Sequence, residues 1–140
     1  MQKQISINQA IEHFSILKKL PISRAWRGYG SSIFFEFGKI DDKGAGDYTL
    51  AVSNNWWLKS SALSLDAGSS FSEIDNFLQK LMSMSLQDVS VVDDKLLFTF
   101  DNCELKIILN SMENNGWSLN KIEEAFLTTS GGSFILEKED

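Results

Sequence analysis

The chain of 140 residues carries a weak internal repeat, and this repeat constrains the fold more than any other feature of the sequence. Three patterns recur at a spacing of about 60 residues: alternating apolar residues at 33–37 and 96–100, Leu-x-Lys-Leu at 17–20 and 78–81, and Asn-Asn-x-Trp at 54–57 and 114–117. The repeat therefore predicts that each half contains a helix, three strands and a further strand that carries a tryptophan. The alternative explanation is that amphipathic helices and hairpins resemble one another in any chain.

Two helices are predicted, one at the start of each half. Ser6 with Gln9, and Ser70 with Glu73, form capping-box patterns ahead of apolar residues at the spacing of one helix face. Pro21 blocks continuation of the first helix because it lacks an N–H and clashes with the preceding turn. We therefore expect helices at 7–20 and 71–82.

Alternating apolar and polar residues, separated by glycine, aspartate and asparagine, predict strands in the rest of the chain. The predicted strands are 22–29, 32–38, 47–53, 56–60, 86–92, 95–100, 104–109, a short one near 117, and a closing hairpin of 125–129 and 133–137. Each set of strands needs a cover for its apolar face, and we expect the helix that precedes it to supply one. The predicted fold class is α+β, with antiparallel sheets covered by two helices.

The length and composition predict one domain, residues 1–140, because a chain of this size buries its apolar residues in one core. Its repeat halves cover about 5–60 and 70–120, and the closing hairpin occupies 121–140. The first residues are polar and lack the apolar core of a secretory signal, and no segment reaches the ~20 apolar residues of a membrane span. Cys103 is the only cysteine, which fits a reducing compartment, so we expect a cytoplasmic protein that does not enter membranes.

The net charge of −6 bears on the class of partner. Affinity for nucleic acids depends largely on basic side chains that neutralise phosphates, so nucleic acid is not an expected partner. A basic protein partner is favoured instead. Acidity that serves only solubility is the alternative.

The residue types that carry most catalytic chemistry are scarce. His13 is the only histidine, so no second histidine can complete a zinc site. It would have to serve in any histidine-based triad, and no Gly-x-Ser-x-Gly motif is present. Cys103 lies between Asp101 and Glu104, whose negative charges raise the pKa of a thiol instead of activating it. We expect a non-enzymatic protein with no catalytic residue, metal or cofactor.

The candidate partner-binding residues are two aromatic anchors and five carboxylates. Neighbouring residues of a strand point to opposite faces, and the alignment of Trp57 with Trp117 assigns those two side chains to the core. Trp56 then becomes an exposed anchor, unless another element covers it. Phe34 is the second anchor, on the outer sheet face. The carboxylates expected to steer a basic partner are Asp41, Asp42, Asp47, Asp93 and Asp94.

Asp41, Asp42 and Asp47 also flank a glycine-containing loop tip, where carboxylate oxygens could hold a divalent cation. Their spacing does not follow that of an EF-hand loop, so a solvated acidic loop is the favoured interpretation.

Small size, acidity and scarce catalytic residue types together resemble the immunity proteins of bacterial toxin systems. The segments Ile33–Gly38, Tyr48–Leu50 and Trp56–Trp57 also resemble uncharacterised small bacterial proteins with paired strand-and-tryptophan halves. The first resemblance implies that the protein neutralises a cognate toxin by direct binding, and that the toxin domain is basic, often a nuclease. Two alternatives remain open: a small-ligand-binding domain with a pocket lined by Trp26 or Trp56, and a structural homodimer formed through the face of Phe34 and Leu97.

Overall fold

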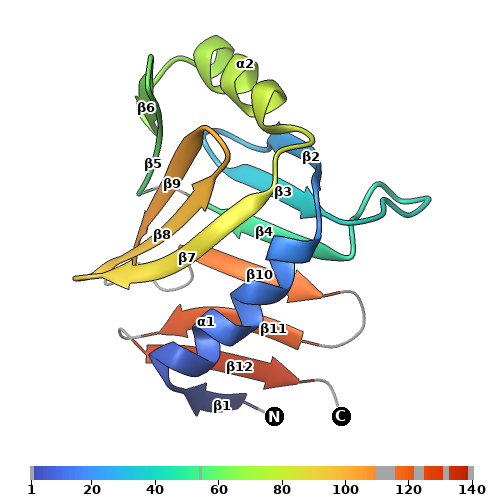
Figure 1. Ribbon diagram of the computed structural model, residues 1–140, viewed down its shortest axis with the longest axis vertical. Helices are drawn as coiled ribbons and strands as arrows, with labels where there is room; N and C mark the ends of the chain where they lie inside the picture. Colours follow the sequence, from blue (N-terminus) through green and yellow to red (C-terminus); the bar gives the residue numbers. More distant parts are fainter. Residues whose placement is uncertain (1, 54, 110–115, 122–124, 131–132, 139–140) are drawn as a thin grey trace.

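Two antiparallel sheets and two α-helices make up the computed structural model, which describes residues 2–53, 55–109, 116–121, 125–130 and 133–138 (Figure 1). The α+β class expected from the sequence is confirmed. The elements in chain order are β1 (Gln2–Ile5), α1 (Ile7–Ser15), the 3-10 helix η1 (Ile16–Lys19), β2 (Ile22–Arg27), β3 (Ile33–Phe37), β4 (Tyr48–Val52), β5 (Trp56–Ser60), β6 (Ser64–Asp66), α2 (Phe71–Leu81), β7 (Leu86–Val92), β8 (Lys95–Phe100), β9 (Cys103–Ile108), β10 (Trp117–Lys121), β11 (Ala125–Ser130) and β12 (Ser133–Lys138).

Both halves of the chain contribute strands to both sheets. We call α1 to β6 the first unit and α2 to β11 the second unit. The seven-stranded sheet has the order β1-β12-β11-β10-β4-β3-β2, and the five-stranded sheet has the order β6-β5-β9-β8-β7. The first three strands of each unit thus share a sheet with the fourth and fifth strands of the other unit, and the third strand pairs with the fourth. The repeated pattern of the sequence folds as two units that exchange their last strands.

The strand registers repeat as closely as the strand order does. A bulge follows the pair Ile22 and Phe37 in β2–β3, and a bulge follows the pair Leu86 and Phe100 in β7–β8. At the exchanged strands, Trp117 pairs with Val52 and Trp56 pairs with Ile107. Trp56, rather than Trp57, is therefore the structural counterpart of Trp117.

Each helix also packs against the other unit, which corrects the expectation that it covers its own strands. Helix α1 and η1 contact β7, and α2 contacts β2. The ring of Phe14 on α1 lies 5.2 Å from the ring of Phe98 and 5.5 Å from that of Trp117, and both of these partners belong to the second unit. The apolar pattern predicts that a helix covers a sheet, but it does not specify which one.

The predicted helix at 7–20 is an α-helix only to Ser15 and continues as η1, whereas α2 is α-helical to Leu81. Ser6 and Ser70 accept hydrogen bonds from the backbone N–H groups of Gln9 and Glu73, which confirms both as N-caps, and the Ser6 N–H completes a capping box with the Gln9 side chain. At the other end, Leu20 N–H donates to Leu17 and Met84 N–H donates to Leu81. Ser6 and Ser70 are 64 positions apart, and so are Leu17 and Leu81. The alignment of 17–20 with 78–81 is therefore wrong by three residues.

The core lies where the two sheets and the two helices meet. Its largest fully buried side chains are Trp56, Trp117, Phe14, Phe35, Phe37 and Phe98. Burial of a large apolar side chain stabilises a fold by roughly 1.5–3 kcal/mol, so these rings hold both units together. Among the described residues, no helix is long and apolar enough to cross a membrane.

Two strands are not predicted by the sequence, β1 and β6, with four and three residues. All the strands that the sequence does predict are present, with ends that differ from the prediction by up to two residues. Asn54, Asn114 and Asn115 of the repeated motif, and the turn of the closing hairpin at 131–132, lie outside the described residues.

Candidate functional site

The loop between β3 and β4 holds three of the expected acidic residues, and its shape depends on Asp41. The Asp41 side chain accepts hydrogen bonds from the N–H groups of Lys43 and Ala45, both at 2.9 Å. These bonds, that of Ala45 foremost, lower the pKa of the Asp41 carboxyl group. Asp42 is exposed, while Asp47 accepts the Lys39 N–H at 3.1 Å and closes the neck of the loop.

The other two acidic residues, Asp93 and Asp94, form the turn between β7 and β8. Asp93 has a positive φ of 58°, a conformation that aspartate tolerates better than most residues. Asp94 pairs with Lys95 at 3.3 Å. This turn and the β3–β4 loop lie on opposite sides of the molecule (Figure 1). The five carboxylates therefore lie on two separate acidic loops and do not form one surface.

Trp56 does not lie at the surface, which corrects its assignment as an exposed anchor. Its side chain is completely buried, and its indole N–H donates to the carbonyl of Ser31 at 3.0 Å. Trp57 is the half-buried member of the pair and lies on the outer face of β5, between Asp66 and Lys106 of the neighbouring strands. Alternation correctly separates the two tryptophans, but the repeat was aligned one residue out of register.

Phe34 lies on the outer face of the seven-stranded sheet, as expected, and is half-buried. Its ring stacks on Trp26 with the ring centroids 4.3 Å apart, and it lies so close to Gly28 that a Cβ there would clash. The guanidinium of Arg24 lies over the Trp26 ring, 4.9 Å from its centroid. Phe34 therefore already has packing partners within the chain.

A buried carboxyl group, that of Glu36, also lies on this outer face. The Thr49 hydroxyl donates to it at 2.7 Å, and the Gly46 N–H approaches it at 3.4 Å. No ion pair joins Glu36 to a described residue. The strand pattern places Glu36 on the outer face, but it gives no sign that the β3–β4 loop folds over it.

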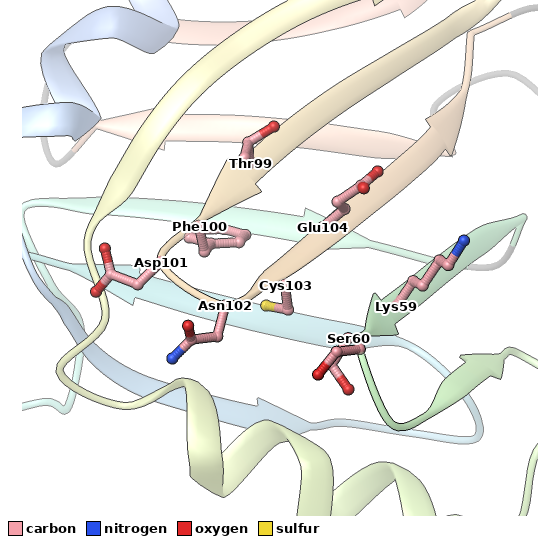
Figure 2. A pocket seen from close by; sticks show the side chains of 9 residues that line it. Lys59, Ser60, Thr99, Phe100, Asp101, Asn102, Cys103 and Glu104 are labelled. Atoms are coloured by element: carbon pink, nitrogen blue, oxygen red, sulfur yellow. The ribbon is translucent and has the colours of Figure 1, made fainter.

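Two open hollows are formed by described residues. One, of about 330 Å³, lies beside the β8–β9 turn, where Lys59 of β5 and Glu104 of β9 project from neighbouring strands (Figure 2). The other, of about 440 Å³, is lined by Ile16, Lys19, Leu20, Asp47, Tyr48 and Lys121. Both are at the small end of ligand-sized cavities, and no tryptophan lines either of them.

Cys103 lines the first hollow but is itself buried (Figure 2). Burial raises the pKa of its thiol to about 11, with smaller contributions from Asp101 and Glu104. The expected direction of the shift is confirmed, although burial outweighs the two carboxylates. A neutral, buried thiol is a poor nucleophile. Among the described residues, no group of three or more histidine, cysteine, aspartate or glutamate side chains could hold a metal ion.

Among the side chains that the structure describes, the most exposed aromatic one is not an expected site residue. Tyr29, at the tip of the β2–β3 hairpin, is 98% exposed. The sequence carries a signal for this: Tyr29 lies at the end of a predicted strand, between Gly28 and Gly30, which have no side chains to cover it. We call residues 28–32 the Tyr29 loop.

The Tyr29 loop is fastened to the body of the protein by Arg27. The guanidinium donates to the carbonyl of Gly30 at 2.9 Å and to that of Gly28 at 3.4 Å. It also pairs with Asp75 of α2 at 2.9 Å and lies 4.1 Å from the ring centroid of Phe71. Arg27 therefore joins the loop to the first turns of α2.

Comparison of the chain with protein-family models, with curated proteins and with solved structures finds no match.

Proposed function

We propose that this protein binds a basic protein partner, in the manner of an immunity protein that neutralises a bacterial toxin, and that it does not catalyse a reaction. The proposal follows the resemblance described above and is supported by the surface charge. Three ion pairs join described residues, and they involve only the carboxylates Asp75, Asp88 and Asp94. The exposed carboxylates with no such ion pair are Glu12, Asp41, Asp42, Asp47, Asp66, Glu73, Asp93, Asp101, Glu104 and Glu137.

The net charge of −6, to which these carboxylates contribute, is the observation that carries the proposal. Charges of one sign on a surface attract a partner of the opposite sign and accelerate association, by an amount that falls with ionic strength. The pKa of Asp41 is lowered by hydrogen bonds within its own loop, so this carboxylate stays ionised in mildly acidic solution as well. The negative charge at this position of the β3–β4 loop therefore persists in mildly acidic and neutral solution.

The experiment pairs a binding measurement with a protection assay. The tagged protein is used to capture partners from its native host, together with the inactive product of the gene immediately upstream. A one-to-one complex whose association slows as salt is added supports the proposal. The double variant Asp41→Asn/Asp42→Asn should slow association, while Lys39→Gln in the same loop should not. A host that survives the active upstream product only when this protein is present completes the support.

Failure of both assays, with no protein captured and no toxin neutralised, contradicts the proposal. No tryptophan lines either hollow described above, so neither of them is the pocket that the ligand-binding alternative requires. The homodimer alternative would be indicated by light scattering that shows a dimer.

A further inference from the structure

The Tyr29 loop presents a single large side chain on a backbone that is held in place. Tyr29 is 98% exposed, so its ring contributes almost nothing to the core. The backbone on both sides is nevertheless tied down. Gly28 N–H donates to Ser32 at 2.8 Å, and Ser32 N–H donates to Tyr29 at 3.3 Å.

Two long side chains from outside the loop complete this fastening. Arg27 donates to the carbonyl groups on either side of Tyr29, and Trp56 donates to the carbonyl of Ser31. Trp56 is fully buried, and Arg27 is fixed in turn by Asp75 and by the ring of Phe71. The loop is therefore connected to the buried core through Trp56 and to α2 through Arg27. A residue presented in this way loses little conformational freedom when it enters a partner.

The counterpart of this loop in the second unit shows that the fold does not require it. β7 and β8 are joined by only the two residues Asp93 and Asp94, although their strands carry the same bulge as β2 and β3. The same scaffold thus closes with a short turn. The longer loop, its two glycines and its exposed aromatic ring need another explanation.

The surroundings of Tyr29 have the composition of an interface hot spot. Tyrosine, tryptophan and arginine are enriched among the residues that dominate binding energy in protein interfaces. Here Tyr29 is exposed, Arg27 donates to the carbonyl groups on either side of it, and the ring of Phe71, which is 52% exposed, lies 4.1 Å from the guanidinium. Asp75 is paired with Arg27, so Glu73, in the first turn of α2, supplies the negative charge that no ion pair takes up at this end of the helix.

We propose that Tyr29 is the anchor by which this protein docks into a pocket of a basic protein partner, with Phe71 and Arg27 at its side. This inference rests on the proposed function and specifies its surface. The partner site is a concave, apolar pocket with a polar group for the phenol hydroxyl and a basic residue facing Glu73. A small molecule is not the occupant, because small ligands bind in concave sites that enclose them, and a projecting ring encloses nothing.

The test uses the full-length protein and the inactive upstream product as the purified probe. Calorimetry should show that Tyr29→Ala weakens binding by about 30-fold or more, the effect of losing a hot-spot residue. Tyr29→Phe, which removes only the hydroxyl, should weaken it by much less. Val92→Ala is the matched control, since Val92 is 54% exposed beside the turn of the second unit. All variants should unfold at the wild-type temperature.

A photo-reactive benzoylphenylalanine at position 29 should cross-link to the same partner, and one at position 92 should not. If the wild type binds the probe and Tyr29→Ala binds it equally well, the anchor is wrong but the proposed function stands. If the wild type binds neither the probe nor any protein of the host, both the Tyr29 anchor and the proposed function are wrong. If Tyr29→Ala instead abolishes self-association, the loop is a contact between copies of this chain, and the inference is wrong.

Discussion

The hairpins β2–β3 and β7–β8 are the first strand pairs of the two units and occupy equivalent places in them, but the loops that join their strands differ. Both carry the bulge after their first pair, and both place alternate residues in the core. One ends in the Tyr29 loop, which is fastened by two buried or half-buried side chains. The other ends in Asp93 and Asp94. What the units share is what the fold requires, and where they differ is where function can be sought.

Among the features that the two units share, the two buried tryptophans should have the largest effect on stability. Trp56→Ala and Trp117→Ala each remove a ring with at most 1% exposure from the core, so each should destabilise the fold by about 3–5 kcal/mol. Because the two rings are structural counterparts, the two losses should be similar. Denaturant unfolding measures both. A loss below about 1 kcal/mol for Trp56→Ala would show that this ring is not in the core.

The Trp56 result also bears on what could be predicted from sequence. Alternation along a strand predicts that one of two neighbouring tryptophans is inside, but not which one. The assignment came from the repeat, where Asn-Asn-x-Trp aligned Trp57 with Trp117. Strand pairing aligns Trp56 instead, because the connection that precedes each strand differs in length between the units. A shift of one residue was enough to move the anchor from surface to core.

Helix caps and strand alternation were predicted correctly because they depend on residues close together in the chain. Ser6 with Gln9 is one such local signal. The exchange of strands and helices between units was not predictable, since two similar units offer equally apolar faces to either helix. β1 was missed because three of its four residues are polar and exposed, so it lacks the alternation that indicates a strand.

A second comparison concerns Glu36 and Thr49, whose counterparts in the second unit are Thr99 and Glu104 in reversed order. The first pair is hydrogen-bonded around a buried carboxyl group, while Glu104 is exposed. Thr49→Val should therefore cost about 1–3 kcal/mol, the penalty for leaving a buried polar group unsatisfied. Thr99→Val should change stability by less than about 0.5 kcal/mol. Equal losses, measured by chemical denaturation, would contradict the comparison.

The tryptophans can be compared again with a milder change. Trp56→Phe loses the hydrogen bond to the Ser31 carbonyl, whereas the indole nitrogen of Trp117 is buried without a hydrogen-bond partner in the structure as described. Trp56→Phe should therefore cost about 1 kcal/mol more than Trp117→Phe. Hydrogen exchange of the Tyr29 loop should also accelerate in Trp56→Phe alone. Unchanged exchange would mean that Trp56 does not fasten the loop.

Cys103, at the start of β9, tests the burial of the second unit. Its pKa of about 11 lies above the ordinary value of 9.0, so the folded protein favours the neutral thiol. The stabilisation is complete below pH 9.0 and is lost as the pH rises through about 11. A thiol reagent should react slowly with the native protein at pH 8 and much faster after unfolding. Equally fast reaction in both states would show that the thiol is exposed.

The smallest effect is expected in the β3–β4 loop. Asp41 has a pKa below its ordinary value of 3.8 because backbone N–H groups bind its ionised form. Its contribution to stability is present above pH 3.8 and is lost as the pH falls through the lower value of the folded state. Asp41→Asn should therefore be slightly less stable than the wild type near neutrality, and the difference should shrink in acid. Asp93→Asn changes the charge of the other acidic loop equally and serves as the control. If both variants give the same pH profile in thermal unfolding, the effect belongs to net charge and not to the hydrogen bonds of Asp41.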